Sequence, residues 1–494
     1  MMLKKITVLF CIAVLFAPVL KSQEHGRYVP ETDPLVLDKL EQWQDLKFGL
    51  LMHWGAYSQW GIVESWSICP EDYGWCERKM GSYENYFKYV EDYENLQKTF
   101  NPVNFDPDNW AAAASYAGMK YVVFTTKHHD GFCMFDTKYT DYKITGKDCP
   151  FHTHPKANVT GEIFSSFRKQ GLWTGAYFSK PDWHCDDYWD PYFPPMDRNV
   201  NYDPYKYPER WQRYVDFTHN QILELCSDYG KLDILWLDGG WVKKNTNKEI
   251  VDIYTDRLKD VGSGFVITDI IDQDVKMDEL VVKAREKQPG LIVVDRAVEG
   301  KNQNYLTPEN QVPEKELPYP WESCIIAGGG WSWVNDAQYR SANDLIHLLV
   351  DIVCKGGNLL LNIAPGPQGQ WHEDAYLRLK DIGDWMQVNG GAIYGTRAIS
   401  PYREGKVCFT RDKVQSKVYA IYLAGTDELT MPAEIEIDAF KSDLPKKVTL
   451  LGVSKAIKVR KTDKGFVIMI PESVRKNPPC KHAWSFKLEG IPIK

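Results

Sequence analysis

The 494-residue sequence contains no CxxC pair, no internal repeat and no low-complexity linker. Without a CxxC pair, neither a zinc ribbon nor a thioredoxin-like redox motif is indicated. A chain of this length is too long for one ordinary core and suggests two domains. Because no linker separates them, we expect these domains to pack directly against each other.

An excess of positive charge is also missing, since 67 Asp and Glu outnumber 59 Lys and Arg and the net charge is −8. This argues against nucleic acid or an anionic membrane surface as a partner. The apolar run Ile6–Leu20 follows Lys4-Lys5 and is too short and too badly flanked to span a membrane comfortably. We therefore predict a signal peptide over residues 1–22 and an exported protein, periplasmic or secreted, with no membrane insertion.

Apolar runs of strand length recur between residues 48 and 364, and none shows clean alternation, as expected of parallel strands buried on both faces. They are Phe48–Trp54, Tyr121–Thr126, Trp173–Ser179, Asp233–Leu237, Phe265–Ile271, Leu291–Val294 and Leu359–Ala364. Helical patterns over Trp110–Ala117 and Pro208–Tyr229 lie between them. This alternation favours an α/β fold with a (β/α)8-like barrel over residues 23–397, with a doubly wound sheet as the alternative.

Beyond residue 398 the pattern changes to short runs that follow one another without helices. These runs are Lys406–Arg411, Lys417–Leu423, Glu434–Asp438, Lys447–Leu451, Ala456–Lys461, Gly465–Ile470 and Ala483–Glu489. Their spacing predicts a C-terminal antiparallel β-sandwich over residues 398–494.

Polar and aromatic residues follow the predicted barrel strands at the point where each strand ends. The clusters are His53-Trp54-Gly55, His128-His129-Asp130, Trp183-His184, Asp238-Gly239-Gly240-Trp241 and Asp295-Arg296. Adjacent strand residues point to opposite faces, so two neighbouring histidines fit a strand end better than a core. Since functional side chains of a barrel gather at the C-terminal strand ends, we expect these clusters to share one rim.

Two chemistries can use such a rim. Histidines with carboxylates could hold a metal for hydrolysis, but neighbouring rings such as His128 and His129 should diverge, and His152-Thr153-His154 lies in a loop. Two carboxylates can instead hydrolyse a glycoside, with histidines, arginine and tryptophans binding the sugar. Asp238 is the best nucleophile candidate, because it ends an apolar strand before two glycines, although a lone Asp-Gly-Gly would suggest a turn or cap. We expect no metal and no cofactor.

Several runs resemble glycoside hydrolase family 29, the α-L-fucosidases. They are residues 47–58, 121–132, 235–239, 320–324 and 357–363, in one order along the chain. The resemblance implies a distorted (β/α) barrel followed by a β-sandwich. It also implies a retaining exo-glycosidase that removes terminal α-L-fucose from a fucosylated oligosaccharide or glycoconjugate without a metal.

Carried over residue by residue, the resemblance makes Asp238 the nucleophile. It places sugar-binding residues at His53, Glu64, Trp66, His128, His129, Tyr177, His184 and Arg296. Considered alone, His53 would be an ordinary core histidine. Arg296 alone would be an ion-pair partner of Asp295 or Asp269.

The general acid matches two positions, Glu322 in Trp321-Glu322-Ser323-Cys324 and Glu309 in Leu306-Thr307-Pro308-Glu309. We favour Glu322, and the acid needs a raised pKa to hold its proton. We predict that the segment from Trp183 to Pro208 forms a loop at the rim, on the side of the leaving group, where it would affect linkage preference. An α-L-galactosidase on the same scaffold and a non-catalytic fucose-binding protein are the alternatives, because an apolar pocket rejects an added hydroxyl only weakly and a fold does not by itself imply catalysis.

Overall fold

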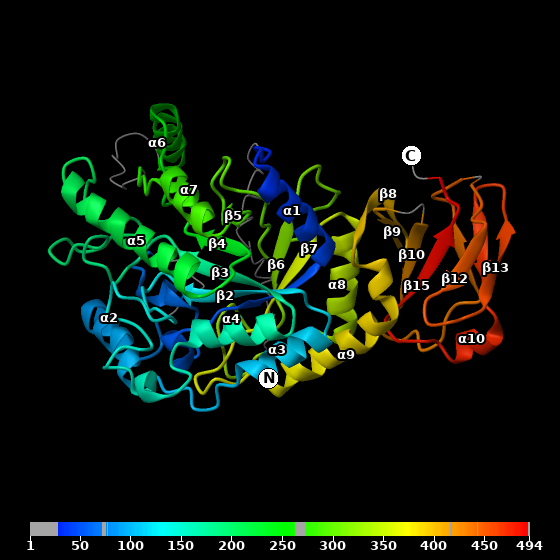
Figure 1. The fold of residues 1–494 in the computed structure, drawn as a ribbon, viewed down its shortest axis with the longest axis horizontal. Helices are drawn as coiled ribbons and strands as arrows, with labels where there is room; N and C mark the ends of the chain where they lie inside the picture. The colour runs from blue at the N-terminus through cyan, green and yellow to red at the C-terminus, as the bar shows by residue number, and fades with distance from the viewer. Residues whose placement is uncertain are drawn as a thin grey trace, which may run out of the picture.

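The computed structural model describes residues 28–71, 76, 78–261, 272–414, 417–441 and 443–492. The predicted signal peptide and the predicted strand Phe265–Ile271 fall outside these residues. Within them the chain forms two sheets that lie side by side with helices between them (Figure 1). No helix in these ranges is long and apolar enough to cross a membrane.

The first sheet has seven parallel strands in the order β5-β4-β3-β2-β1-β7-β6. Their bounds are β1 Phe48–Met52, β2 Tyr121–Lys127, β3 Trp173–Ser179, β4 Ile234–Asp238, β5 Ile292–Asp295, β6 Glu322–Ile326 and β7 Asn358–Asn362. Six of them match predicted apolar runs, which are buried on both faces as expected. Strand β6 was not predicted, because it begins with the polar residues Glu322 and Ser323.

The sheet curls into a half-barrel, and in the described part of the chain β5 and β6 do not pair with each other. The segment between them takes up the gap through single bridges, Gln303 with Val294, Leu306 with Trp321 and Glu309 with Cys324. The predicted fold class, a barrel-like α/β domain followed by an antiparallel domain, is confirmed. The irregular 303–310 segment carries Glu309 to the same edge as the strand ends.

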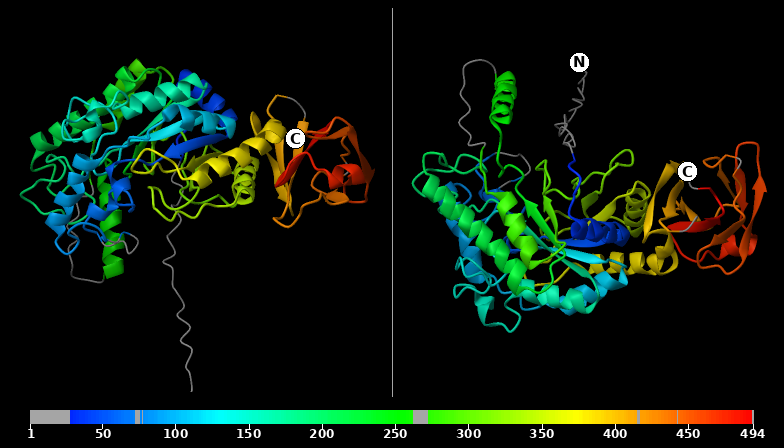
Figure 2. Two further views of the ribbon diagram at one scale, coloured as in Figure 1. Left: turned by 90° about the horizontal axis from the view of Figure 1, so that it is seen from below. Right: turned by 45° about the horizontal axis from the view of Figure 1, so that its top comes forward.

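Most helices cover the outside of the half-barrel and its N-terminal end, whereas α6 projects away from it (Figures 1 and 2). Their bounds are α1 Pro34–Leu46, α2 Tyr86–Glu94, α3 Pro107–Tyr116, α4 Val159–Lys169, α5 Pro208–Asp228, α6 Asn247–Val261, α7 Met277–Lys287, α8 Ala342–Cys354 and α9 Glu373–Asn389. Several begin at a side-chain cap, as where the Asp106 carboxylate accepts the Asn109 N–H. Helix α1 closes the N-terminal end, where Trp43 stacks on Tyr305 with ring centroids 4.0 Å apart.

The second sheet has eight antiparallel strands in the order β11-β14-β13-β12-β15-β10-β9-β8. Their bounds are β8 Thr396–Glu404, β9 Val407–Asp412, β10 Lys417–Leu423, β11 Glu434–Ile437, β12 Lys447–Leu450, β13 Ala456–Lys461, β14 Phe466–Met469 and β15 Ala483–Glu489, with the short helix α10 Glu472–Lys476 after β14. Strand β8 was not predicted, and it crosses the proposed division between residues 397 and 398, which stays a prediction.

The two sheets share packing through α8 and α9, which lie between them (Figures 1 and 2). Along β9 and β10 the side chains alternate: Phe409 and Ala420 enter the core of the second sheet, whereas Cys408 and Ile421 join the core of the half-barrel. The Trp385 indole on α9 also donates a hydrogen bond to the Ala483 carbonyl, 2.9 Å away. The direct packing expected from the missing linker is therefore present.

Candidate active site

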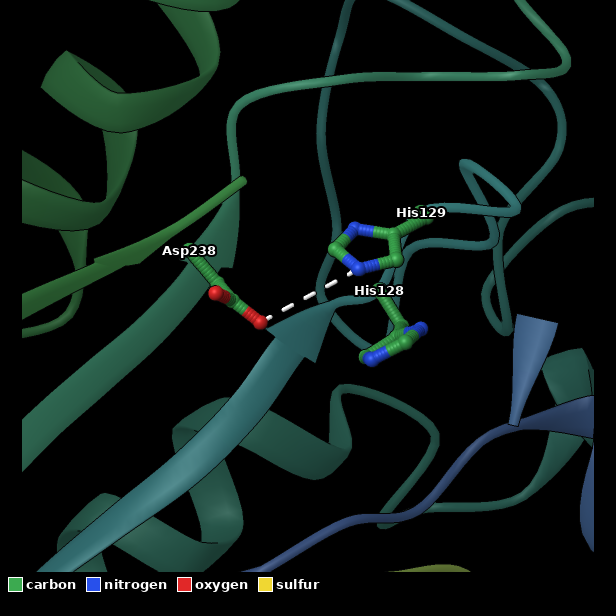
Figure 3. Close-up of side chains that lie close together, drawn as sticks. All are labelled: His128, His129 and Asp238. Atoms are coloured by element: carbon green, nitrogen blue, oxygen red, sulfur yellow. Dashed lines mark ion pairs between the residues drawn. The ribbon is translucent and has the colours of Figure 1, made fainter. Parts of the chain in front are cut away.

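Three histidines and one aspartate meet at the C-terminal edge of the first sheet. His53 follows β1, His128 and His129 follow β2, and Asp238 is the last residue of β4. Because the strands are parallel, their ends lie at one edge, and Figure 3 shows the imidazoles of His128 and His129 beside the Asp238 carboxylate. The rim expected from the strand-end clusters is thus present.

Asp238 is held as a carboxylate by its neighbours. The Tyr177 hydroxyl donates to Oδ2 over 2.6 Å, and the Arg296 guanidinium donates to Oδ1 over 3.0 Å. Burial opposes ionisation, but Arg296, His129 and the Tyr177 hydrogen bond together hold the pKa of Asp238 well below its usual range. The side chain is 14 % exposed, so the charge faces the pocket rather than bulk water.

Glu309 binds the other end of the same guanidinium. Arg296 Nη1 pairs with Asp238, and its Nη2 pairs with Glu309 Oε2. The Trp331 indole donates to Glu309 Oε1 over 3.1 Å, and the Glu309 side chain is 39 % exposed. Two carboxylates are therefore fixed on either side of one planar guanidinium, with the second one open to solvent.

Glu322 lies elsewhere, which disagrees with our preference for it as the general acid. It is the first residue of β6, level with Asn358 at the start of β7, whereas Asp238 ends β4. Glu322 is fully buried, and its carboxylate accepts hydrogen bonds from Tyr121 (2.5 Å) and Tyr305 (3.2 Å). Burial raises its pKa to about 7, the shift expected of an acid, but the group faces the closed N-terminal end of the half-barrel.

Each histidine is oriented by a second polar group. His53 Nδ1 lies 2.9 Å from Asn362 Oδ1, His128 Nδ1 lies 2.6 Å from Ser65 Oγ, and His129 Nδ1 lies 2.5 Å from Ser179 Oγ. The Asn362 amide in turn donates to the Trp331 carbonyl over 2.9 Å, so Asn362 Oδ1 faces His53 and accepts its Nδ1 proton.

The three rings are neutral at ordinary pH. Burial lowers the pKa of His53 and of His129 to about 4, and it lowers the pKa of His128 well below its usual value. A neutral imidazole has one nitrogen that donates and one that accepts. With Nδ1 used inside the protein, each ring offers Nε2 to the pocket, which suits the hydroxyl groups of a sugar.

The expectation that the rings of His128 and His129 diverge is wrong. Their centroids are 4.2 Å apart at an interplanar angle of 41°, because β2 ends at Lys127 and the alternation of strand side chains ends with it. Ligand atoms of His128, His129 and Asp238 all lie within 4.8 Å of one another, a spacing that a metal ion could use. A cation there would meet the Arg296 guanidinium on the same carboxylate, so a neutral polyhydroxylated ligand fits these groups better.

Glu64 precedes the short helical turn Ser65–Ile68 beside the histidines, and Trp66 is the second residue of that turn. The Glu64 carboxylate is buried, finds no hydrogen-bond partner within the described ranges, and has its pKa raised to about 8 by burial. The Trp66 ring centroid lies 5.2 Å from that of His129. A buried carboxyl group without a partner is costly, which indicates a place for a ligand.

Two further tryptophans line this side of the pocket. The rings of Trp183 and Trp241 lie 5.1 and 5.2 Å from His129. We did not assign either as a site residue, although both stand in clusters that follow predicted strands. Trp331, whose ring lies 5.2 Å from that of His53, was also missed, because a loop far along the chain brings it there.

The two residues expected in the pocket wall differ in position. Tyr177 bonds Asp238 directly, and its ring lies 5.2 Å from that of His53. His184 is further out: its Nδ1 pairs with Glu94 Oε1 over 2.7 Å, its ring stacks on Tyr142, and it is 37 % exposed. The described contacts do not bring His184 to Asp238.

Two buried ion pairs brace the rim. Lys127 Nζ lies 2.8 Å from Asp182 Oδ2, which joins the ends of β2 and β3. Lys180 Nζ lies 2.5 Å from Asp295 Oδ1, and the Lys180 N–H donates to the Asp238 carbonyl over 3.0 Å. Lys127 precedes His128 and Asp295 precedes Arg296 in the sequence, and Lys180 is hydrogen-bonded to the Asp238 backbone, so the pairs hold the strand ends that present those groups.

An ionised carboxylate, a second carboxylate across one arginine and neutral hydroxyl-binding imidazoles at the edge of a barrel-like sheet define a glycoside hydrolase. Comparison with known proteins gives the family. The sequence matches the family model "Alpha-L-fucosidase" over residues 15–391 and the model "Alpha-L-fucosidase C-terminal domain" over residues 401–489. The chain therefore belongs to the α-L-fucosidases, glycoside hydrolase family 29, and the resemblance is confirmed.

Individual relatives cover nearly the whole chain. It is 27% identical over 492 residues to the tissue α-L-fucosidase of Homo sapiens, covering 96% of this chain and 94% of that protein. It is 29% identical over 484 residues to the tissue α-L-fucosidase of Bos taurus, covering 94% and 92%. The structure of α-L-fucosidase isoenzyme 1 from Paenibacillus thiaminolyticus matches with a TM-score of 0.70 and 27% identity, covering 92% of this chain and 99% of that chain. Nothing in these matches favours an α-L-galactosidase or a non-catalytic binding protein.

Proposed function

We propose that the chain is a retaining exo-α-L-fucosidase that removes terminal α-L-fucose from fucosylated oligosaccharides or glycoconjugates. The observation that carries this proposal is the pair of carboxylates, Asp238 and Glu309, on the two ends of the Arg296 guanidinium. A retaining glycosidase needs one ionised carboxylate as nucleophile and a second carboxyl group beside the leaving oxygen. The family membership of the chain supports the same assignment.

In the first step an oxygen of Asp238 attacks the anomeric carbon of fucose, and the bond from that carbon to the glycosidic oxygen breaks. Glu309 gives its proton to that oxygen, so the shortened glycan leaves as an alcohol. In the second step Glu309 takes a proton from water, which attacks the anomeric carbon and releases Asp238. The solvent exposure of Glu309 fits a group that must exchange protons and admit water.

Tyr177 and Arg296 keep the nucleophile ready. Burial and the Asp238 charge raise the pKa of Tyr177 well above its usual value, so its hydroxyl stays protonated and donates a hydrogen bond to Asp238 Oδ2. Arg296 keeps its charge beside the two carboxylates, because both raise its pKa. Their role in the proposal is to hold Asp238 ionised and oriented in a buried pocket.

Fucose recognition falls to His53, His128 and His129 through their free Nε2 atoms, and to Glu64. With its pKa raised to about 8, Glu64 carries a proton at neutral pH and is able to donate to a sugar hydroxyl. The indole of Trp66 supplies an apolar surface for the C–H face of the ring. Substrate recognition in the proposal therefore uses hydrogen bonds and stacking, and no metal.

The proposal is tested with purified residues 23–494 on 4-nitrophenyl α-L-fucoside, with and without a chelator, beside Asp238→Ala and Asp238→Asn. We expect turnover that is unaffected by the chelator and falls by at least about 10⁴-fold in both variants, because no other group can form the glycosyl-enzyme. The 4-nitrophenyl α-L-galactoside is run in parallel. Faster turnover of the galactoside, loss of activity with the chelator, or an active Asp238→Ala variant would each contradict the proposal.

A further inference from the structure

A second concave surface lies next to the fucose pocket, and we call it the rim groove. Its volume is about 340 Å³, near the lower end of ligand-binding cavities. One wall is the helix α2, and the other is the segment that follows β3. The lining residues are Tyr86, Phe87, Val90, Glu91 and Glu94 from α2, and Trp183, Trp189 and 190–195 from that segment.

Aromatic rings stand exposed in the rim groove. Tyr192 is 89 % exposed, Phe87 is 66 % exposed and Phe193 is 44 % exposed. Large rings in one concave patch usually mark a binding site, because exposing them to water is unfavourable. Flat aromatic faces are suited to the C–H faces of a pyranose ring.

Trp183 connects the rim groove to the catalytic centre. It lines the groove, and its ring lies 5.1 Å from His129 and 5.4 Å from Trp66. On its other side it stacks on Trp189 at 5.2 Å and 9°. Since His129 Nε2 is 3.9 Å from Asp238 Oδ2, only the Trp183 ring and His129 separate the groove from the nucleophile.

The groove wall is held in place rather than left free. The Arg198 carbonyl accepts hydrogen bonds from the Trp183 indole (3.2 Å) and from the Tyr188 hydroxyl (3.0 Å). The Trp189 indole donates to the Asn199 carbonyl over 2.9 Å. Fixing these rings before a ligand arrives lowers the entropic cost of binding.

Charge narrows the class of ligand. Three carboxylates, Glu91, Glu94 and Asp190, line the groove, and they pair with Lys88, His184 and Arg210, none of which lines it. His184 pairs with Glu94, which places this predicted sugar-binding residue at the groove rather than in the fucose pocket. Carboxylates accept hydrogen bonds from hydroxyl groups, and no basic side chain lines the groove to pair with the carboxylate of a sialylated sugar, so the groove favours a neutral sugar.

We propose that the rim groove is a carbohydrate subsite that binds a neutral pyranose unit of the oligosaccharide carrying the fucose. This inference rests on the proposed fucosidase function and adds a substrate class to it. A subsite of this kind tightens the binding of oligosaccharides and leaves simple aryl fucosides unaffected. Substitutions in the groove therefore change KM for the larger substrates only.

The test compares Phe87→Ala and Tyr192→Ala with the control Tyr139→Ala, which removes a 42 %-exposed ring outside the groove. Substrates are 2′-fucosyllactose, 3-fucosyllactose, lacto-N-fucopentaose I and 4-nitrophenyl α-L-fucoside. For the oligosaccharides that the parent cleaves, we expect KM to rise about 3–10-fold per ring with kcat unchanged. The aryl fucoside should be unaffected in every variant, and Tyr139→Ala should match the parent.

Binding is measured separately, so that a failure of catalysis does not decide the question. The Asp238→Ala chain is titrated with the same oligosaccharides and a sialylated counterpart, with tryptophan fluorescence as the readout and with and without Tyr192→Ala. Weaker binding of neutral oligosaccharides in the groove variant, and weak binding of the sialylated one, support the inference. Equal binding with and without Tyr192→Ala would overturn the inference, as would a sialylated ligand that binds as tightly as the neutral ones. A groove variant that changes only the self-association of the protein, measured by sedimentation, would overturn it too. Failure of the aryl fucoside assay would instead count against the function itself.

Discussion

Replacing Glu309 by Ala removes the carboxyl group that we propose as acid and base while leaving Asp238 and its bond to Arg296 in place. Glu309 accepts from Trp331 Nε1 and pairs with Arg296, and its side chain is 39 % exposed, so its loss leaves no buried charge without a partner. General acid–base groups contribute about 10²–10⁴-fold to rate, or roughly 3–5 kcal/mol of the activation barrier. We expect a loss of this size wherever the leaving group needs a proton.

The assay compares leaving groups. For fucosyllactose, whose leaving group is an alkyl alcohol, kcat/KM of Glu309→Ala should fall by about 10³-fold. For 2,4-dinitrophenyl α-L-fucoside, whose leaving group departs without a proton, kcat/KM should fall less than about 10-fold, because kcat/KM reports the first step. The missing base slows only the second step and so lowers kcat. Added azide should restore turnover and give fucosyl azide of retained configuration, since azide needs no general base to attack the glycosyl-enzyme.

The matched control is Glu322→Gln, which alters the other candidate glutamate. We expect its kcat/KM to stay within about 3-fold of the parent for both substrates, since the described contacts of Glu322 are to Tyr121 and Tyr305. A leaving-group-dependent loss in Glu322→Gln together with an unaffected Glu309→Ala would refute the reasoning. Equal losses on both substrates in Glu309→Ala would show that Glu309 acts through Arg296 rather than as an acid.

Three further outcomes follow from the contacts. Tyr177→Phe removes a hydrogen bond that lowers the pKa of Asp238, so the acid limb of the kcat/KM profile should move about 1–2 pH units upward; a limb that stays put or moves down would contradict this. Glu322 has its pKa raised from 4.5 to about 7, so the free energy of unfolding should fall by roughly 3 kcal/mol as the pH rises from 4.5 to 7 and above. Glu322→Gln should lack this loss. Urea unfolding of the parent with the same free energy from pH 4.5 to 8 would disprove the expectation. Lys180→Met leaves Asp295 buried without its partner and should cost about 3–5 kcal/mol of unfolding free energy, against less than about 0.5 for the exposed Lys138→Met; equal effects would show that the buried pair contributes little.

Most of the fold could be predicted because buried parallel strands are continuous apolar runs. Strands such as Trp173–Ser179 and Ala456–Lys461 have the bounds expected from the sequence. Strand β6 escaped because two polar residues open it, and the pairing of Glu322 with two tyrosines depends on contacts that no local pattern records. The sequence also could not show that β5 and β6 do not pair. Bridges such as Glu309 with Cys324 occupy the gap between them, and these bridges depend on the packing of the whole half-barrel.

The centre of the site could also be predicted, because strand ends of a barrel converge and the polar clusters stand directly after them. This reasoning brought Asp238, His53 and the two adjacent histidines together before their distances were known. It could not rank Glu309 above Glu322, because their difference lies in position along the half-barrel rather than in residue type. Likewise, nothing in the sequence around His184 indicates its pairing with Glu94, 90 residues earlier.

The central claim, that Asp238 forms a covalent bond to fucose, is tested most directly by trapping that bond. A 2-deoxy-2-fluoro-fucosyl fluoride slows the release of the sugar, and peptide mass spectrometry of the inactivated protein locates the adduct. The account predicts one added sugar, on the peptide that contains Asp238, and none in Asp238→Asn. Inactivation with the adduct on Glu309 or Glu64, or steady turnover of the reagent with no adduct on any carboxylate, would contradict it.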